Sequence, residues 1–184
     1  MSLEQKINNL ETDLHIMGTL VLDSLVGAVR ALEDKDTLKA SEVMDKDDEI
    51  DDAYMKIDQD WFELMATEQP VASDLRLSTS ILQASLHLER LGDLSVYLGK
   101  TTHEIHDLPI PESLHKIVVE MGDMVIDMAS SALESLKNRD AELALSTARK
   151  DELINSLYNK MLNEVPNISG CLLYTSDAAD EVVR

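Results

Sequence analysis

Two pairs of acidic residues, each spaced four positions apart, give this sequence its clearest capacity for chemistry. They are Asp47 with Asp51 and Glu89 with Asp93. On a helix this spacing places both carboxylates on one face, about 5–6 Å apart at Cβ, where their charges repel unless a cation or water compensates them. Carboxylates from facing helices can ligate iron, zinc, manganese or magnesium, so a multinuclear metal site is one chemistry that these pairs support.

Position is more informative here than spacing. Acids make up 36 of 184 residues, so roughly seven pairs at this spacing are expected by chance. Glu89 and Asp93, however, interrupt an apolar helical stripe, and Asp47 lies in line with inward-facing positions. Partly buried carboxylates need a cation or hydrogen-bond donors. An ion pair with Arg76 or Arg90 would meet that need as well as a metal would.

The remaining reactive residues do not form a catalytic set. A ferritin-like oxidase needs Glu-x-x-His on two helices, whereas the only such spacing is Glu112 to His115, where Glu112 suits a helix start. There is no glycine-rich phosphate loop, and Cys171 is the only cysteine. We therefore expect a protein that is not an enzyme. The alternative is a di-metal carboxylate helical-bundle enzyme, which redox activity with bound iron would support.

The elements that must position these residues are predicted to be long helices. Apolar residues make up 44% of the chain and aromatics only 3%, and leucine, alanine, methionine, glutamate and lysine favour helix. The apolar period predicts helices at about 3–32, 38–67, 73–103, 112–136 and 141–164, with Ser73 or Asp74 capping the third. A linker with two prolines spans Asp107 to Pro111. Long helices joined by short turns predict an all-α fold of antiparallel bundles.

The net charge of −20 limits the partners. So acidic a surface repels nucleic acid and anionic lipid, and it attracts metal cations or a basic patch on another protein. We found no run that approaches the roughly 18 apolar residues of a membrane span, and no signal peptide. We expect a cytoplasmic protein without bound nucleic acid.

An internal repeat is visible at an offset of 104 residues. When residues 17–54 are aligned with residues 121–158 without a gap, 12 of 38 positions are identical, including Gly18 with Gly122 and Tyr54 with Tyr158. The first two predicted helices are therefore duplicated as the last two, and the third has no duplicate before the chain ends.

The segment Gln69 to Arg76, QPVASDLR, followed by LERLGD from Leu88 to Asp93, closely resembles the signature of the PhoU family. The resemblance implies two three-helix bundles in tandem. Residues 1–106 would form the first, and residues 112–166 would supply the first two helices of the second, which would be incomplete.

The resemblance also implies metal binding through an E/D-x-x-x-D motif on the second and third helices of each repeat. Asp47 with Asp51 and Glu89 with Asp93 match both motifs of the first repeat. In the second repeat Asp151 matches the first position, but Asn155 replaces the second acid. The implied cofactor is a multinuclear cluster, with iron or zinc expected first.

The family function implied by this resemblance is negative regulation of phosphate uptake and of the phosphate-starvation response. Such a protein links the ATPase subunit of the phosphate ABC transporter to a sensor histidine kinase, associates peripherally with that membrane complex and is expected to form a homodimer. Two alternatives are the cytosolic domain of a sodium–phosphate cotransporter and a helical scaffold whose acids are only solvated.

The last residues, 167–184, break the pattern of the rest. The string from Cys171 to Glu181 resembles the in-frame translation of a sequencing adapter, and none of the positions from Cys171 to Arg184 matches its counterpart at the offset of 104. We expect a non-native tail. Without a sixth helix, we expect an apolar groove on the second repeat, lined by Val118, Val125, Leu133, Leu145 and Leu157.

Overall fold

The computed structural model describes residues 1–164, and all regular structure in that range is helical, which confirms the all-α fold. The helices are α1 (Leu3–Asp34), α2 (Thr37–Asp45), α3 (Asp47–Glu68), α4 (Ala72–Ile105), α5 (Glu112–Asn138) and α6 (Ala141–Arg149), followed by a helical stretch at 151–164. The predicted tail at 167–184 lies outside the described residues.

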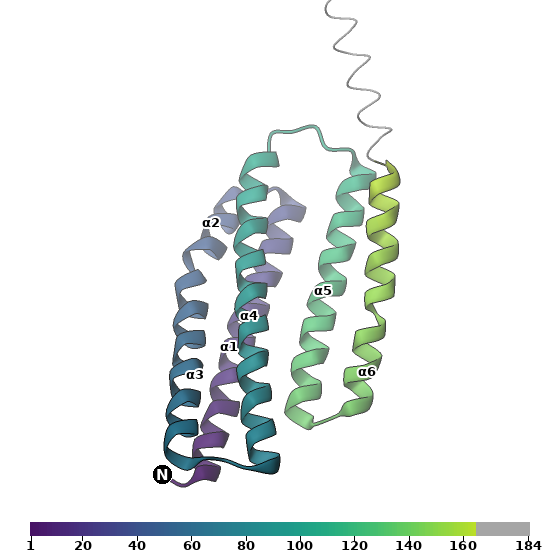
Figure 1. Ribbon diagram of the computed structural model, residues 1–184. Coiled ribbons are helices and arrows are strands. Elements are labelled where there is room, and N and C mark those ends of the chain that lie inside the picture. The colour runs from purple at the N-terminus through teal and green to yellow at the C-terminus, as the bar shows by residue number, and fades with distance from the viewer. Residues whose placement is uncertain (165–184) are drawn as a thin grey trace, which may run out of the picture.

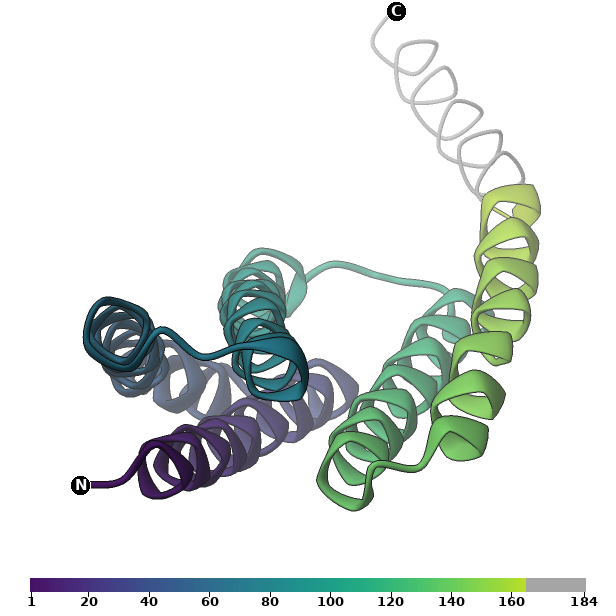
Figure 2. The same ribbon diagram turned by 60° about the horizontal axis from the view of Figure 1, so that its bottom comes forward.

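Helix α1 is the central element of the structure. It packs against α2, α3 and α4 on one side, which together form the first bundle, and against α5 on the other (Figures 1 and 2). One apolar face of α1 supplies half of the main core. The core residues are Ile7, Leu10, Leu14, Met17, Val21, Ile50, Ile57, Leu64, Ile81 and Leu88.

Helix α1 is also apolar enough to cross a membrane by length and composition. Its most apolar window of 18 residues has a mean hydropathy of 1.4, and half of that window is buried inside the protein. The sequence prediction that no run approaches this length was therefore wrong. The buried part of this stretch includes Leu14, Met17 and Val21, which belong to the core shared with α3 and α4, whereas Ile16 and Val26 are exposed.

Helix α4 packs closely because most residues of its inner stripe are small. The buried positions alternate at spacings of three and four residues, and they are Ser78, Ile81, Ser85, Leu88, Gly92, Ser95, Gly99 and Thr102. Each buried hydroxyl donates a hydrogen bond to a carbonyl one turn earlier in the helix, at 2.8–3.0 Å. The hydroxyls are thereby satisfied, and the small side chains allow α4 to lie close to α1 and α2.

The predicted helices at 38–67 and 141–164 are each broken in two, at Lys46 and Lys150. Lys46 N–H donates to Val43 and Lys150 N–H donates to Thr147, so the local bonding changes from four residues back to three. Acidic residues follow each break immediately, and acids are favourable in a first helical turn. The predicted cap of the third helix was also wrong, because α4 begins after Val71 without a side-chain cap.

The backbone repeats its conformation at the offset of 104. Lys35 and Arg139 both end a helix in the left-handed region, with φ of 54° and 53°. Asp36 and Asp140 then cap the following helices, α2 and α6, through two backbone N–H groups each.

Helices α1 and α5 meet through the two equivalent glycines. A Cβ placed on Gly18 would lie 2.8 Å from the Leu133 side chain, and one placed on Gly122 would lie 2.8 Å from Val29. Val29 and Leu133 are themselves equivalent at the repeat offset. In each repeat, the equivalent apolar side chain packs over the equivalent glycine of the other repeat. This reciprocal contact relates the two repeats by an approximate two-fold axis.

Candidate metal centre

The two acidic pairs lie opposite one another because α3 and α4 run antiparallel in contact (Figure 1). Gly92 of α4 lies directly opposite Ile50 of α3, because a Cβ on Gly92 would lie 3.1 Å from the Ile50 side chain. Asp47 and Asp51 flank Ile50 on α3, while Glu89 and Asp93 flank Gly92 on α4. The four predicted first-repeat ligands therefore lie near enough along the contact between α3 and α4 for their charges to act on one another, with Asp93 exposed to solvent.

Asp47 is the most constrained of the four. Burial raises its pKa first, and the charges of Asp51 and Asp93 raise it further. Its Oδ1 atom is buried and has no hydrogen-bond partner among the described residues. A buried carboxylate oxygen without a donor is costly, and a bound cation would remove that cost.

Glu89 is the corresponding residue on α4. Burial again raises its pKa first, followed by the charges of Asp93 and Asp51. The neighbouring Arg90 opposes this shift only partly. Within residues 1–164, neither Arg90 nor Arg76 forms an ion pair with the cluster. The ion-pair explanation of these carboxylates is therefore not what the structure shows.

The four carboxylates fit a hard or borderline cation in their donor chemistry. They present only oxygen donors, two of them have raised pKa values, and Asp47 has an oxygen with no donor. In the described part of the chain, no three acidic, histidine or cysteine side chains already converge as a finished ligand set.

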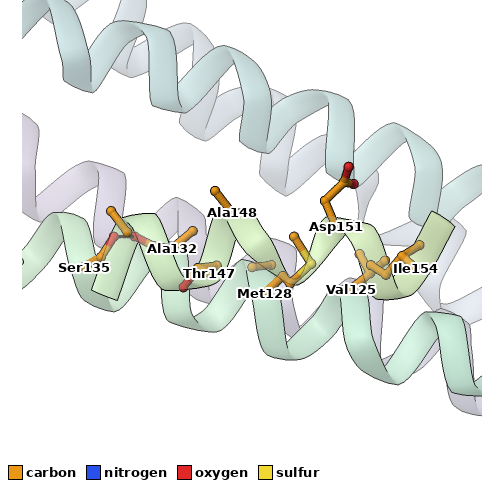
Figure 3. Close-up of a pocket in the computed structure, with 10 residues that line it drawn as sticks. Val125, Met128, Ala132, Ser135, Thr147, Ala148, Asp151 and Ile154 are labelled. Carbon is orange, nitrogen blue, oxygen red and sulfur yellow. Dashed lines mark hydrogen bonds between the residues drawn. The ribbon is translucent and has the colours of Figure 1, made fainter. Parts of the chain in front are cut away.

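Asp151, the ligand expected in the second repeat, is not joined to the other four. It is exposed, and it accepts a hydrogen bond of 2.9 Å from Asn155 Nδ2. Asp151 begins the helical stretch at 151–164, which lies beside α5, and no other described helix covers its outer side in the way that α4 covers α3 (Figure 2). Asp151 borders an open groove (Figure 3).

That groove is the duplicate of the face that α4 covers in the first bundle. It is lined by Val125, Met128, Ala129, Ala132, Ser135, Ala144, Thr147, Ala148, Asp151 and Ile154. Their counterparts at the repeat offset include Val21, Ala28, Ala40 and Ile50, all buried in the first bundle. Of the predicted groove residues only Val125 lines it. Leu133 packs on Gly18 instead, and Leu145 is largely exposed.

Comparison with known proteins agrees with this architecture. The sequence model described as the PhoU domain matches residues 14–102 and 118–180, two segments whose starts have the spacing of the internal repeat. The chain belongs to the PhoU family. The expectation of an all-α fold of helical bundles is therefore confirmed, whereas the metal-binding role of the acidic motifs stays a prediction.

Individual members of the PhoU family are similar to this chain over most of its length. The phosphate-specific transport system accessory protein PhoU homolog of Clostridium acetobutylicum is 32% identical, over 90% of this chain and 75% of the relative. The homolog of Pseudomonas putida is also 32% identical, over 87% of this chain and 62% of the relative. The chain thus spans between three-fifths and three-quarters of these relatives.

Two solved structures show the same fold. The crystal structure of PhoU from Pseudomonas aeruginosa superposes with a TM-score of 0.87 at 30% identity, covering 91% of this chain and 80% of that one. The phosphate transport system regulatory protein PhoU from Streptococcus pneumoniae gives 0.83 at 28% identity, covering 91% and 78%.

One cation near Asp47, Lys100, was not singled out from the sequence. Its charge acts on Asp47 and lowers the pKa of that carboxyl, against the dominant effect of burial. The signal was present, because Lys100 lies seven positions after Asp93 and therefore shares its helical stripe.

Proposed function

We propose that this chain is a metal-binding regulator of phosphate transport that acts by contacting other proteins. Its relatives are named accessory and regulatory proteins of phosphate transport systems. The observation that supports metal binding in this chain is the facing set of Asp47, Asp51, Glu89 and Asp93, with its unpartnered Asp47 oxygen. Iron and zinc are the first candidates, ahead of manganese and magnesium.

The proposed partners are the ATPase subunit of the phosphate transporter and the cytoplasmic part of a sensor histidine kinase. In this proposal the protein is cytoplasmic, forms a homodimer, and represses phosphate uptake when phosphate is plentiful. Its function is to join the two complexes, without catalysis and without nucleic acid. A net charge of −20 supports contact with basic protein surfaces and opposes DNA binding.

The metal site is tested by replacing all four carboxylates in Asp47→Asn, Asp51→Asn, Glu89→Gln and Asp93→Asn. The variant should lose the iron or zinc that copurifies with the wild-type protein, as measured by elemental analysis. Metal-free, it should remain folded, because the substitutions remove charge repulsion. Asp151→Asn is the matched control and should retain the metal. Equal metal in the quadruple variant and the wild type would disprove the site.

The regulatory role is tested in a bacterium that lacks its own family member. The chain should restore repression of a phosphate-starvation reporter, and the quadruple variant should not. Copurification of the transporter ATPase subunit or the kinase with a tagged chain would test the partners separately. Repression that does not need the four carboxylates would separate the regulatory function from the metal.

A further inference from the structure

The outer side of helices α3 and α4 is an uncovered surface of the first bundle. These two helices contact each other, α1 and α2, and no other described helix lies over their outer side (Figures 1 and 2). Four large apolar side chains are exposed on this surface, which we call the α3–α4 face: Met55, Phe62, Leu75 and Leu86. Phe62, the only phenylalanine of the chain, is 66% exposed. An exposed apolar patch of this kind is typical of a protein-binding surface.

Helical spacing and antiparallel packing gather the four side chains into one strip. Met55 and Phe62 are seven residues apart and therefore share one stripe of α3, and the two leucines are eleven residues apart on α4. Because Gly92 lies opposite Ile50 and both helices rise by about 1.5 Å per residue, Met55 is level with Leu86. Phe62 lies two turns further along α3, level with the stretch of α4 between the two leucines. The apolar strip thus crosses both helices.

The charges of the α3–α4 face are divided between its two helices. Helix α3 contains nine acidic residues and one basic residue. Asp51 and Asp58 lie four residues before and three residues after Met55, so they flank the apolar strip. On α4, Arg90 follows Leu86 by four residues, is exposed, and forms no ion pair within 4.0 Å among residues 1–164. The face therefore has an acidic half on α3 and an arginine on α4 whose charge is not paired there.

This arrangement is self-complementary, which is what a contact between two identical chains related by a two-fold axis requires. With the axis parallel to the helices, α3 of one copy lies over α4 of the other at the same level. Met55 then packs against Leu86 of the partner subunit, and Arg90 lies beside the partner's Asp51. An axis across the helices would instead place α3 on α3 and oppose acids to acids, which is costly. The distribution of charge therefore favours the axis parallel to the helices.

The α3–α4 face is also large enough for a stable dimer. Helix α3 has 22 residues and is therefore about 33 Å long, and two neighbouring helices are together about 20 Å wide. Contact over this face would bury roughly 650 Å² on each copy, or about 1,300 Å² in total, and stable interfaces bury about 1,200–2,000 Å². The apolar strip would form the centre of the interface, and the charged residues would form its rim.

We propose that the α3–α4 face binds a second copy of this chain in a two-fold dimer whose axis is parallel to the helices, with Met55 of each copy against Leu86 of the other. This inference rests on the homodimer proposed above and does not depend on the metal site. It assigns the dimer interface to the first bundle, away from the open groove of the second repeat.

The first experiment measures dimerisation of the whole chain by sedimentation velocity, in the presence of a chelator so that no metal ion bridges two copies. The wild type should form a concentration-dependent dimer. Met55→Glu and Leu86→Arg should each weaken dimerisation by at least about tenfold, because each places an unpaired charge against an apolar side chain twice in the dimer. Leu153→Glu is the matched control and should leave the dimer unchanged, since Leu153 is 58% exposed and Met55 is 57% exposed. Thermal melting followed by circular dichroism should show that all three variants are folded.

A mixture of the two monomeric variants gives the sharper measurement. In a mixed dimer, the carboxylate introduced at position 55 of one copy lies opposite the guanidinium introduced at position 86 of the other, and the second contact is that of the wild type. An equimolar mixture of Met55→Glu and Leu86→Arg should therefore form a dimer that neither variant forms alone. Effects confined to one chain cannot produce this result, because each chain in the mixture still carries a single substitution.

Three results would overturn the inference, each in a different way. A monomeric wild type would overturn it together with the proposed homodimer, and would leave the metal site and the regulatory role to their own tests. Dimerisation that is unchanged in both variants would overturn the α3–α4 face alone, because the dimer would then use another surface. Two variants that are monomeric alone and also when mixed would show that Met55 and Leu86 do not meet across the dimer.

Discussion

The first bundle and the second repeat contain the same helical hairpin in two environments. In the first, α4 covers the hairpin and Ile50 is only 2% exposed. In the second, the equivalent Ile154 borders the open groove. The backbone caps and the breaks before Asp47 and Asp151 are the same in both. The local sequence therefore determines the hairpin, and the covering helix determines whether its first aspartate is partly buried beside other carboxylates.

The contrast is clearest in the two aspartates. Asp47 meets carboxylates from α4 and has an oxygen shielded from water. Among the described residues, Asp151 accepts a hydrogen bond from Asn155 and is exposed. A carboxylate in water is well solvated and needs no metal, whereas a partly buried one among like charges does. Duplication of the sequence has not duplicated the surroundings of the aspartate within the described residues.

The strongest test of this comparison truncates the equivalent isoleucines. Ile50→Ala should lower the free energy of unfolding by about 2–5 kcal/mol, because it leaves a cavity in a packed core. Ile154→Ala should cost less than about 1 kcal/mol, because the side chain lies in an open groove. Urea denaturation followed by circular dichroism measures both. Similar losses would show that the second hairpin is covered in solution.

Helix content and the internal repeat could both be predicted from the sequence, because each depends on local period or on matched positions. The assignment of Asp47, Asp51, Glu89 and Asp93 as metal ligands stays a prediction. Ile50 and Ile154 are identical residues, so their different burial could not be predicted from local sequence. The helix breaks at Lys46 and Lys150 were missed for a related reason. The apolar period continues across them, while the change in hydrogen bonding occurs in the backbone.

The groove prediction failed in an instructive way. Leu133 was assigned to the groove by helical period, yet it fills the space above Gly18. The helical period of apolar residues identifies an apolar face, but it does not show which neighbouring helix covers that face. The pairing of Gly18 with Gly122 in the repeat was the available signal, since two shared glycines at equivalent helix positions predict a close helix contact.

The two glycines provide the next test, since they join the repeats. Gly122→Ala should destabilise the chain by about 1 kcal/mol, because overpacking against the stiff, buried Val29 exceeds the gain in helix propensity. Gly18→Ala should be closer to neutral, because its Cβ meets the flexible end of Leu133. Urea midpoints measure both.

A double variant checks the mechanism of the glycine effect. Adding Val29→Ala should make Gly122→Ala favourable rather than costly, which a double-mutant cycle detects as coupling between the two sites. If the two substitutions lowered the free energy of unfolding additively, Gly122 and Val29 would not be in contact in solution.

The pH dependence of the metal-free protein tests the acidic cluster with a smaller expected effect. Asp47 and Glu89 have raised pKa values in the folded state, so their charged forms destabilise it. That destabilisation is present above the folded pKa values and is relieved as pH falls through them toward the unfolded values. The cluster should therefore make the metal-free chain more stable in mild acid than at pH 7.

The measurement is the melting temperature in the presence of chelator, between about pH 7 and pH 4.5. The lower limit is the ordinary pKa of a glutamate side chain. The double variant Asp47→Asn, Glu89→Gln should lose the contribution of the cluster, and Asp151→Asn should retain it. The shift should be smaller than the glycine effect, because water screens half-exposed charges. An identical profile in the double variant would show that the cluster is fully solvated.

The smallest effect is expected from restoring the acidic pair of the second repeat with Asn155→Asp. The substitution recreates the spacing of Asp47 and Asp51, and it replaces the hydrogen bond from Asn155 with like charges four residues apart. Such a pair on an exposed helix costs about 0.2–0.5 kcal/mol. Metal content should not rise, because two solvated carboxylates without a facing helix have neither the ligand number nor the burial of the first site. Elemental analysis of Asn155→Asp beside the wild type makes the comparison. An additional bound metal ion, lost again in Asp151→Asn, would show that the motif alone suffices and that coverage by α4 is not what distinguishes the two repeats.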